Sequence, residues 1–530
     1  MTVLKEWIFS TDHKRIGIMY LIGSIAAFCV AGVMALLMRT ELAQVGPTII
    51  TNPQQYNVWL YFHGAAMILG FQIPALTGFF ANYLIPLQIG AKDVAFPRLN
   101  AFSLWLFWMG IILALLTFIV PDPPDIMWTG YPPYSIKTAG NTALYTFTVL
   151  IFGFSSIAGG INLICTIIYM RAPNVTWNKL NIFVWSTLAA FVLQLIFVPV
   201  LATAVTLLTL DKYLGTHFFD PAAGGDVLLY QNLFWFYSHP AVYVILLPFM
   251  GIIFEIVATF AKNRIFNYKM VVYGGLWGTA LMSGEVWIHH NYASGLPDWA
   301  RIATMMTTLL ISVPIGLLMI GLIGTLYRGA IQFKTPMLYA SGFLFLFLIG
   351  GLTGIPNAIT SINVAIHDTH FITAHFHYVM AVSGTFAIFG GVYYLLPKMC
   401  GKMYNETLGV VAFIVMFIGV NTVFMTMFFV GLNGMPRRYF DYSQFPAELG
   451  LERMHLIQTY GTYIIAVAFL LILINWIHCL VAGEKAPDNP WGSKSLEWTH
   501  TPTPPGPGNF GGEIPELPEN WSPYGYDIDN

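Results

Sequence analysis

Long apolar runs recur along the chain, and within them hydrophobic and polar residues do not alternate. Each run covers about 20 residues or more, which is enough for a helix to cross a hydrocarbon core roughly 30 Å thick. Because backbone groups in a bilayer must be paired within the membrane-spanning structure itself, such runs predict helices and not strands. We count twelve, at about 16–38, 57–90, 101–120, 144–170, 180–208, 227–262, 271–292, 300–327, 337–361, 371–400, 407–432 and 457–482. The pattern therefore predicts an all-α polytopic membrane protein with about twelve transmembrane helices.

Composition supports this fold class. The 530 residues are 57% hydrophobic and only 9% charged, whereas a soluble domain is about 25% charged. The first apolar run follows the polar start "TDHKRIG" and has no small-residue cleavage site, so we expect no cleavable signal peptide. The chain ends in a Pro- and Gly-rich stretch, "THTPTPPGPGNFGG", which is typical of an extended arm. We therefore expect a membrane domain over 1–483 and a cytoplasmic tail over 484–530.

The charges of the predicted loops indicate the orientation of the chain. With the tail excluded, the loops on the N-terminal side carry fourteen Lys and Arg residues, and those on the other side carry seven. By the positive-inside rule we expect both termini in the cytoplasm if the membrane is the inner membrane of a bacterium, or in the equivalent matrix compartment. The outer loops also hold several acids, which would suit a basic electron donor or a partner subunit. Solvation of the loops is the simpler reading of the same acids.

Six histidines inside the apolar runs are candidate ligands. They are His63, His239, His289, His290, His375 and His377. A single histidine between helices is more often a hydrogen-bonded polar residue than a metal ligand. Six together favour function, because polar groups in a bilayer are costly. If the run at 371–400 is a helix, His375 and His377 lie roughly 200° apart around its axis, so we expect them to serve different metal ions.

A copper site is predicted from two of the runs. His239 and Tyr243 of "SHPAVY" are four residues apart and share a helix face. His289 and His290 are adjacent, and both could reach a metal beside the outer end of their helix. Three imidazoles suit copper, and the phenol would lie at its edge. His63, with His375 or His377, is left as an axial ligand of the kind that holds haem iron.

Several motifs resemble the haem–copper oxygen reductases, and specifically the catalytic subunit I of the cytochrome c oxidase type. The resemblance covers about residues 5 to 500 and rests on "TDHKRIG", "HGAAM", "SHPAVY", "WIHHNY", "HDTHFITAHFHYV", "GKMYNETLG" and "GMPRRYFDY". It implies the bundle fold of that family. It also implies low-spin haem ligands His63 and His377, high-spin haem ligand His375, copper ligands His239, His289 and His290, and a covalent link between His239 and Tyr243.

The resemblance implies further cofactor contacts. Arg437 and Arg438 match a pair that binds haem propionates, where a guanidinium faces a carboxylate; stabilisation of a helix end is the alternative. Arg39 of "MRTEL" resembles the partner of a haem formyl group. His367 and Asp368 match a magnesium site whose remaining ligand would come from another subunit. The implied cofactors are two haems of type A, one copper ion and one magnesium ion.

The implied partners are the other oxidase subunits, cytochrome c or an equivalent donor, O2 and the lipid bilayer, with no nucleic acid. The four cysteines of the chain form no CxxC or CxxxC motif, so no thiolate metal cluster is predicted. One partner subunit must therefore receive the electrons first.

Proton delivery departs from the family pattern. Asn82, Asp93 and Asn100 match the beginning of a proton channel, but the glutamate that follows "HP" in the common branch is Ala241 here. "YSHP" places two hydroxyls, those of Tyr237 and Ser238, just before His239. Hydroxyls can pass protons by exchanging hydrogen bonds, so we expect these two to act as the relay.

A second proton route of the family uses a lysine after a Pro-Thr-Gly sequence. Here "SVPIGLL" supplies Ile315 and Leu317, and neither side chain can carry a proton. The seventh run contributes instead an acid, Glu285, one helical turn before His289. An intramembrane carboxyl is functional by default, so we expect Glu285 to shuttle protons or to tune the copper; a structural carboxyl paired with a neighbouring helix is the alternative.

Three functions are compatible with these residues. The first is reduction of O2 to water with proton uptake and pumping, favoured by Tyr243 and Asp93. The second is nitric oxide reduction on the same scaffold, favoured by the missing lysine and by Glu285. The third, from another class, is an ion-coupled secondary transporter, which predicts broken helices and inverted repeats that this sequence does not show.

Overall fold

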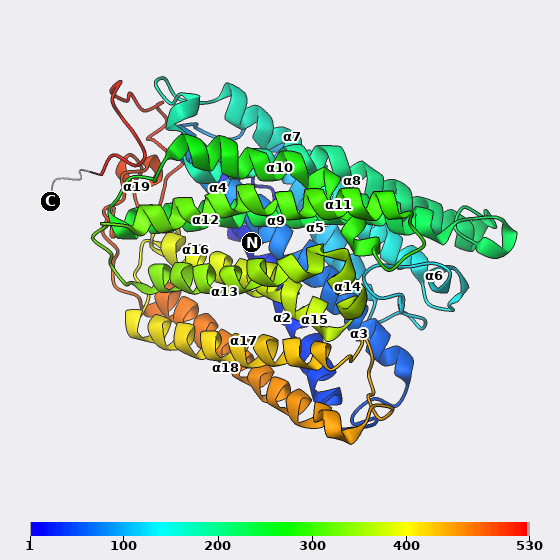
Figure 1. Cartoon of the computed structure of the whole chain (residues 1–530). Helices are drawn as coiled ribbons and strands as arrows, with labels where there is room; N and C mark the ends of the chain where they lie inside the picture. The colour runs from blue at the N-terminus through cyan, green and yellow to red at the C-terminus, as the bar shows by residue number, and fades with distance from the viewer. Residues whose placement is uncertain (1, 527–530) are drawn as a thin grey trace.

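The computed structural model describes residues 2–526 and shows a bundle of long helices that run between two ends of the molecule (Figure 1). The described residues form no β-strand beyond three isolated bridges. The α-helices are α1 Thr2–Ile8, α2 His13–Glu41, α3 Pro53–Ala65, α4 Ala81–Ile89, α5 Pro97–Leu116, α6 Tyr134–Lys137, α7 Thr142–Tyr169, α8 Ile182–Leu214, α9 Val227–Ala261, α10 Gly278–Met282, α11 Asp298–Leu310, α12 Ser312–Leu326, α13 Thr335–Ala358, α14 Thr360–Ile366, α15 His370–Phe376, α16 Ser383–Cys400, α17 Glu406–Leu432, α18 Leu451–Ala482 and α19 Leu496–Thr499.

Shorter π- and 3₁₀-helices complete the described chain. The π-helices are η1 Ala66–Gln72, η2 Pro74–Phe80, η5 Met270–Trp277 and η8 His377–Val382, and the 3₁₀-helices are η3 Trp177–Lys179, η4 Pro221–Ala223, η6 Ser283–Glu285, η7 Trp287–Asn291 and η9 Ala447–Leu449. Within residues 2–526, eleven helices are long and apolar enough to cross a membrane. The prediction of an all-α polytopic membrane protein is confirmed.

The seventh apolar run differs from the regular helix that its length predicts, because it is divided among η5, α10, η6 and η7. It still crosses the bundle. Before the run, Asn263 Nδ2 donates to the carbonyl of Thr325 (3.1 Å), at the end of α12. At its end, Asn291 Nδ2 donates to Asn232 Oδ1 (3.1 Å), near the start of α9. Asn232 and Asn263 lie near opposite ends of α9, so the run passes from one end of the bundle to the other. It is seventh in chain order and, added to the eleven long helices, brings the number of crossings to twelve.

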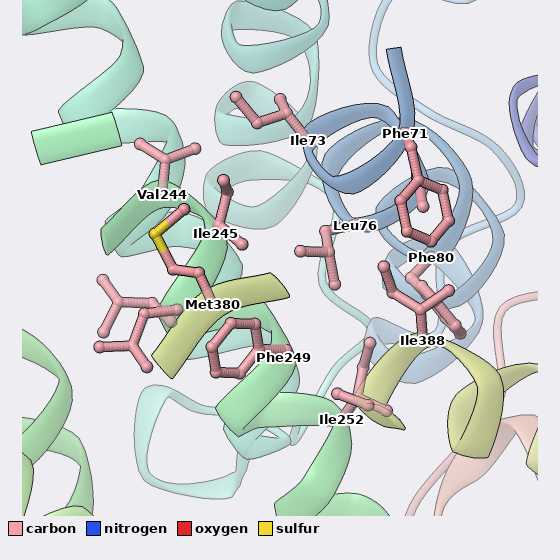
Figure 2. Packing of buried hydrophobic residues seen from close by; sticks show 14 of the residues in the cluster. Phe71, Ile73, Leu76, Phe80, Val244, Ile245, Phe249, Ile252, Met380 and Ile388 are labelled. Carbon is pink, nitrogen blue, oxygen red and sulfur yellow. The ribbon is translucent and has the colours of Figure 1, made fainter. Parts of the chain in front are cut away.

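Helix α9 is the centre of the bundle. In the most apolar 18-residue stretch of α9, 94% of the residues are buried, against 33% in the corresponding stretches of α2 and α18. Figure 2 shows Val244, Ile245 and Phe249 of α9 packed among side chains of the second and tenth spans, such as Leu76 and Met380. The apolar core therefore holds three spans at fixed positions, and these three carry four of the six histidines singled out above.

The tail covers the end of the bundle at which α2 begins. His13 Nε2 lies 3.0 Å from Asn509 Oδ1. Lys398 Nζ donates to Thr503 Oγ1 (2.6 Å). On α9, Glu255 Oε1 accepts a hydrogen bond from the hydroxyl of Tyr524 (2.5 Å). The two ends of the described chain therefore lie at the same end of the molecule, as an even number of crossings requires.

Candidate functional site

A cavity of about 1310 Å³ lies between the helices. A pocket for one ligand of ordinary size is about 300–1,000 Å³, so this cavity has room for more than one large cofactor. All six candidate histidines named above line it. It is also lined by Arg39, Tyr237, Ser238, Tyr243, His367, Asp368, Arg437 and Arg438.

Three histidines converge at one wall of this cavity. His239 comes from α9, whereas His289 and His290 come from η7. Their candidate ligand atoms all lie within 4.8 Å of one another, and His239 Nδ1 is 3.1 Å from His290 Nε2. The sequence predicts that the adjacent pair reaches a common point from an α-helix; the structure achieves this on a 3₁₀ turn. Three nitrogen donors on one point suit copper.

Neighbouring side chains hold the cluster in place. Trp235 stacks on His290 with ring centroids 3.5 Å apart and planes 6° apart. Thr308 Oγ1 lies 3.1 Å from His289 Nδ1. Tyr243 lies beside His239, with ring centroids 4.9 Å apart, as their spacing of four residues predicts. His239 Nε2 is buried and has no hydrogen-bond partner among the described residues, which leaves it available to a metal ion.

The other three histidines share one feature of their hydrogen bonding. The Nδ1 atom of each lies close to a backbone carbonyl: His63 to Ala31 (3.0 Å), His375 to Gly350 (3.0 Å) and His377 to Thr373 (2.7 Å). Because a carbonyl only accepts, Nδ1 must carry the proton. The Nε2 atom of each ring is then unprotonated and can bind iron, with the carbonyl orienting the ring.

His375 and His377 point toward different neighbours. His375 is bonded to α13 through Gly350 and lies within electrostatic reach of His239. His377 begins the π-helix η8 and stacks on Phe424 of α17, with ring centroids 4.5 Å apart. It also lies within electrostatic reach of His63. The arrangement gives one position between His63 and His377 and another between His375 and the three-histidine cluster.

The charged residues at one edge of the cavity form a connected group. Arg437 Nε donates to Asp368 Oδ1 (2.7 Å). Although burial alone would raise it, the nearby guanidinium holds the pKa of Asp368 below its ordinary value. His367 Nε2 lies 3.9 Å from Asp368 Oδ2, and burial lowers the pKa of His367. Arg438 Nη2 is buried without a hydrogen-bond partner within the described chain, so it is free to bind an anionic group.

The residues matched to the proton channel lie near the tail. Asp93 lies in the loop before α5, and burial raises the pKa of its carboxyl to about 6. Asn82 and Asn100 are almost fully buried, and among residues 2–526 the amide atoms of Asn100 find no partner. A cavity of about 20 Å³ follows, lined by Asn82 and by residues that include Tyr20 and Ser103. Its volume fits about one water molecule.

Sequence reasoning missed the hydroxyl groups of this small cavity. Tyr20 lies 2.7 Å from Ser103 Oγ, and Ser155 Oγ donates to the carbonyl of Ser103 (2.7 Å). Ser103 could have been predicted from the sequence, because it follows Asn100 by three residues and therefore shares its helix face. The contribution of Ser155 was not readable, since it comes from another helix.

The predicted place of Glu285 beside the copper ligands is wrong. Glu285 is exposed and does not line the large cavity. The expectation assumed an α-helix, but Glu285 lies in η6 and His289 in η7. At three residues per turn, positions four apart do not share a face. The backbone carbonyl of Glu285 accepts from Thr307 Oγ1 (3.1 Å), while its carboxylate faces outward. Ile315 lines the large cavity and gives it only an aliphatic surface.

The cavity fits haem and copper in both size and donor type. Its walls offer three imidazoles that converge on one point, three further histidines whose Nε2 atoms are unprotonated, and a buried guanidinium with an unpaired nitrogen. A helical membrane bundle built around such a cavity defines a haem–copper oxidase. A solved haem–copper terminal oxidase dimer has the same fold: its chain matches with a TM-score of 0.75 at 18% identity, over 89% of this chain and 85% of that one.

Sequence comparison identifies the family. Residues 15–464 match the family of cytochrome c and quinol oxidase polypeptide I, and the chain belongs to this family. Cytochrome c oxidase subunit 1 of Synechocystis sp. is 43% identical over 523 residues, which cover 98% of this chain and 92% of that protein. The subunit 1 of Thermostichus vulcanus is 40% identical over 531 residues with the same coverage. Family membership brings haem and copper as cofactors and makes the chain a multi-pass membrane oxidoreductase.

Proposed function

We propose that this chain is the catalytic subunit of a terminal respiratory oxidase that reduces O2 to water. The observation that carries the proposal is the three-histidine cluster with Tyr243 beside His239, facing the same cavity as His375. Reduction of one O2 needs four electrons and four protons. Haem iron and copper supply O2 binding and electron transfer when they are bound, and Tyr243 adds an oxidisable phenol whose hydroxyl can give up a proton.

The cofactors are assigned to the residues whose free donor atoms face the cavity. His63 and His377 would hold the low-spin haem, His375 the high-spin haem, and His239, His289 and His290 the copper. Arg437 and Arg438 would bind haem carboxylates. Arg39, whose Nη2 lies 2.7 Å from His455 Nδ1, would bind the formyl group of a haem A. His367 and Asp368 would hold the magnesium ion together with a partner subunit.

Protons for the reaction start from Asp93. A pKa of about 6 lets its carboxyl take up and release protons near neutral pH. Asn82, Asn100 and the small hydroxyl-lined cavity continue the route inward. Tyr237 and Ser238 line the large cavity and come just before His239, so they form the last relay. Pumping would run along the same route, because Ile315 and Leu317 cannot conduct protons.

We expect Tyr237→Phe to lower the rate of O2 consumption on the order of tenfold, about 1.4 kcal/mol of barrier, because the ring stays and only the hydroxyl group, which exchanges the proton, is lost. Glu285→Gln is the matched comparison and should keep a rate close to the parent's, since its carboxylate faces outward. Oxygen-electrode turnover with haem and copper content measures both. A slow Glu285→Gln protein with normal Tyr237→Phe turnover would reverse this assignment.

The proposed location is the inner membrane of a bacterium, with both termini in the cytoplasm. The donor is cytochrome c or an equivalent carrier, which binds through other oxidase subunits. The exposed acids of the predicted outer loops, including Asp122 and Asp226, suit a basic donor, whereas Asp125 is buried.

Turnover with O2 and with nitric oxide, measured on one purified preparation that shows haem absorption bands, tests the function. We expect rapid O2 reduction and much slower nitric oxide reduction, because Tyr243 is in place and Glu285 is not beside the metal cluster. Faster consumption of nitric oxide than of O2 would contradict the proposal.

A further inference from the structure

His370 is an unpaired imidazole at the edge of the large cavity. It begins α15, and only 5% of its surface is exposed. Neither of its ring nitrogens has a hydrogen-bond partner among the described residues, and its side chain lines the cavity. Burying polar nitrogens without partners is costly. A polar group bound in the cavity would remove that cost.

The backbone holds His370 next to the arginine pair. The His370 N–H donates to the carbonyl of Met435 (3.0 Å), and the Arg437 N–H donates to the carbonyl of Asp368 (2.8 Å). These two bonds flank an antiparallel bridge between Thr369 and Pro436. The segment before α15 is thereby paired with the segment that carries Arg437 and Arg438, so the imidazole and the guanidinium groups reach the same edge of the cavity.

The surroundings of His370 favour an anionic ligand. Arg39 and Arg437 lie within electrostatic reach of its ring, as does His377. His455 lies edge-on to His370 with ring centroids 5.5 Å apart, and Arg39 Nη2 lies 2.7 Å from His455 Nδ1. The carboxylate of Asp368, two residues before His370 in the chain, accepts a hydrogen bond from Arg437 Nε (2.7 Å) and makes none with the His370 ring.

We propose that His370 donates a hydrogen bond to a carboxylate of the low-spin haem and thereby raises the reduction potential of that haem. The inference rests on the proposed function, which places this haem between His63 and His377. The nearness of His370 to His377 assigns it to the low-spin haem. A hydrogen bond to a carboxylate disperses negative charge near the iron, which favours the reduced form. His370 is thus a positioning residue that acts on the iron through the carboxylate.

A redox titration of the purified holoenzyme, followed at the low-spin haem band, tests the inference. His370→Phe keeps the size of the ring and removes the donor. At the midpoint potential of the parent, we expect its ratio of oxidised to reduced low-spin haem to rise on the order of tenfold, which corresponds to about 59 mV for one electron. His370→Gln keeps an N–H donor and should change the ratio less than twofold.

His478→Phe is the matched control, because His478 is exposed on α18 and the same substitution there should leave the titration unchanged. If His370→Phe does not accumulate with haem, His370→Ala replaces it and must show the same lowered potential. A parental midpoint in the donor-free variant would overturn the inference and leave the oxidase function intact. A parent protein without haem bands would overturn both.

Discussion

Replacing His239, His289 or His290 with alanine should abolish O2 reduction and remove copper, while both haems stay bound. Each imidazole supplies one of only three donors, and the candidate donor atoms lie within 4.8 Å of one another, so a single loss leaves two ligands for the ion. The haem positions use other residues on α3, α15 and η8, which are not altered. Metal analysis and haem spectra of the purified variants measure the two effects separately.

An exposed histidine provides the control for this experiment. His217→Ala removes an imidazole from an exposed loop and should keep parental copper content and turnover. Full copper content in any of the three cluster variants would refute the assignment of that residue.

The second large effect concerns the haems. His377→Ala should remove the low-spin haem signal, and His375→Ala should remove the high-spin signal. The reason is that His377 lies near His63, whereas His375 lies near the three-histidine cluster. Turnover should fall to background in both variants, because electrons need one haem and O2 needs the other.

Absorption spectra with and without carbon monoxide, which binds only a haem with an open position, separate the two species. Loss of the carbon monoxide response in His377→Ala, with its retention in His375→Ala, would exchange the two assignments.

The spans and the six candidate histidines could be predicted because the cost of placing a residue in a membrane depends on the type of that residue. A run of about 20 apolar residues or an imidazole within it can be recognised without knowing any neighbour. His375 and His377 could even be assigned to different sides, since a spacing of two residues separates faces in any helix. Tyr243 could be placed beside His239 for the same local reason.

Predictions that assumed a regular helix were less successful. The segment that contains Glu285 and His289 has the length of a span, but it is built from π, α and 3₁₀ turns. Hydropathy does not distinguish these turns, and the number of residues per turn decides which side chains share a face. The prediction for His289 and His290 held because adjacent residues stay close together in any type of helix. The prediction for Glu285, four residues before His289, depended on the number of residues per turn and therefore failed.

Contacts between distant segments could not be predicted. Ser155 meets Tyr20 and Ser103 only because three spans pack together. The place of His370 beside the arginine pair depends on the bridge between Thr369 and Pro436. Neither feature has a periodicity in the sequence.

The contact between His13 and Asn509 has a consequence for how the protein is made. The two residues are 496 positions apart, and a chain grows at about 5–20 residues per second, so the partner of His13 emerges about 25 to 100 s later. During this interval the polar end of α2 is without the segment that covers it. The end of the bundle at which α2 begins is therefore completed only near the end of synthesis, and until then it is open to the aqueous phase.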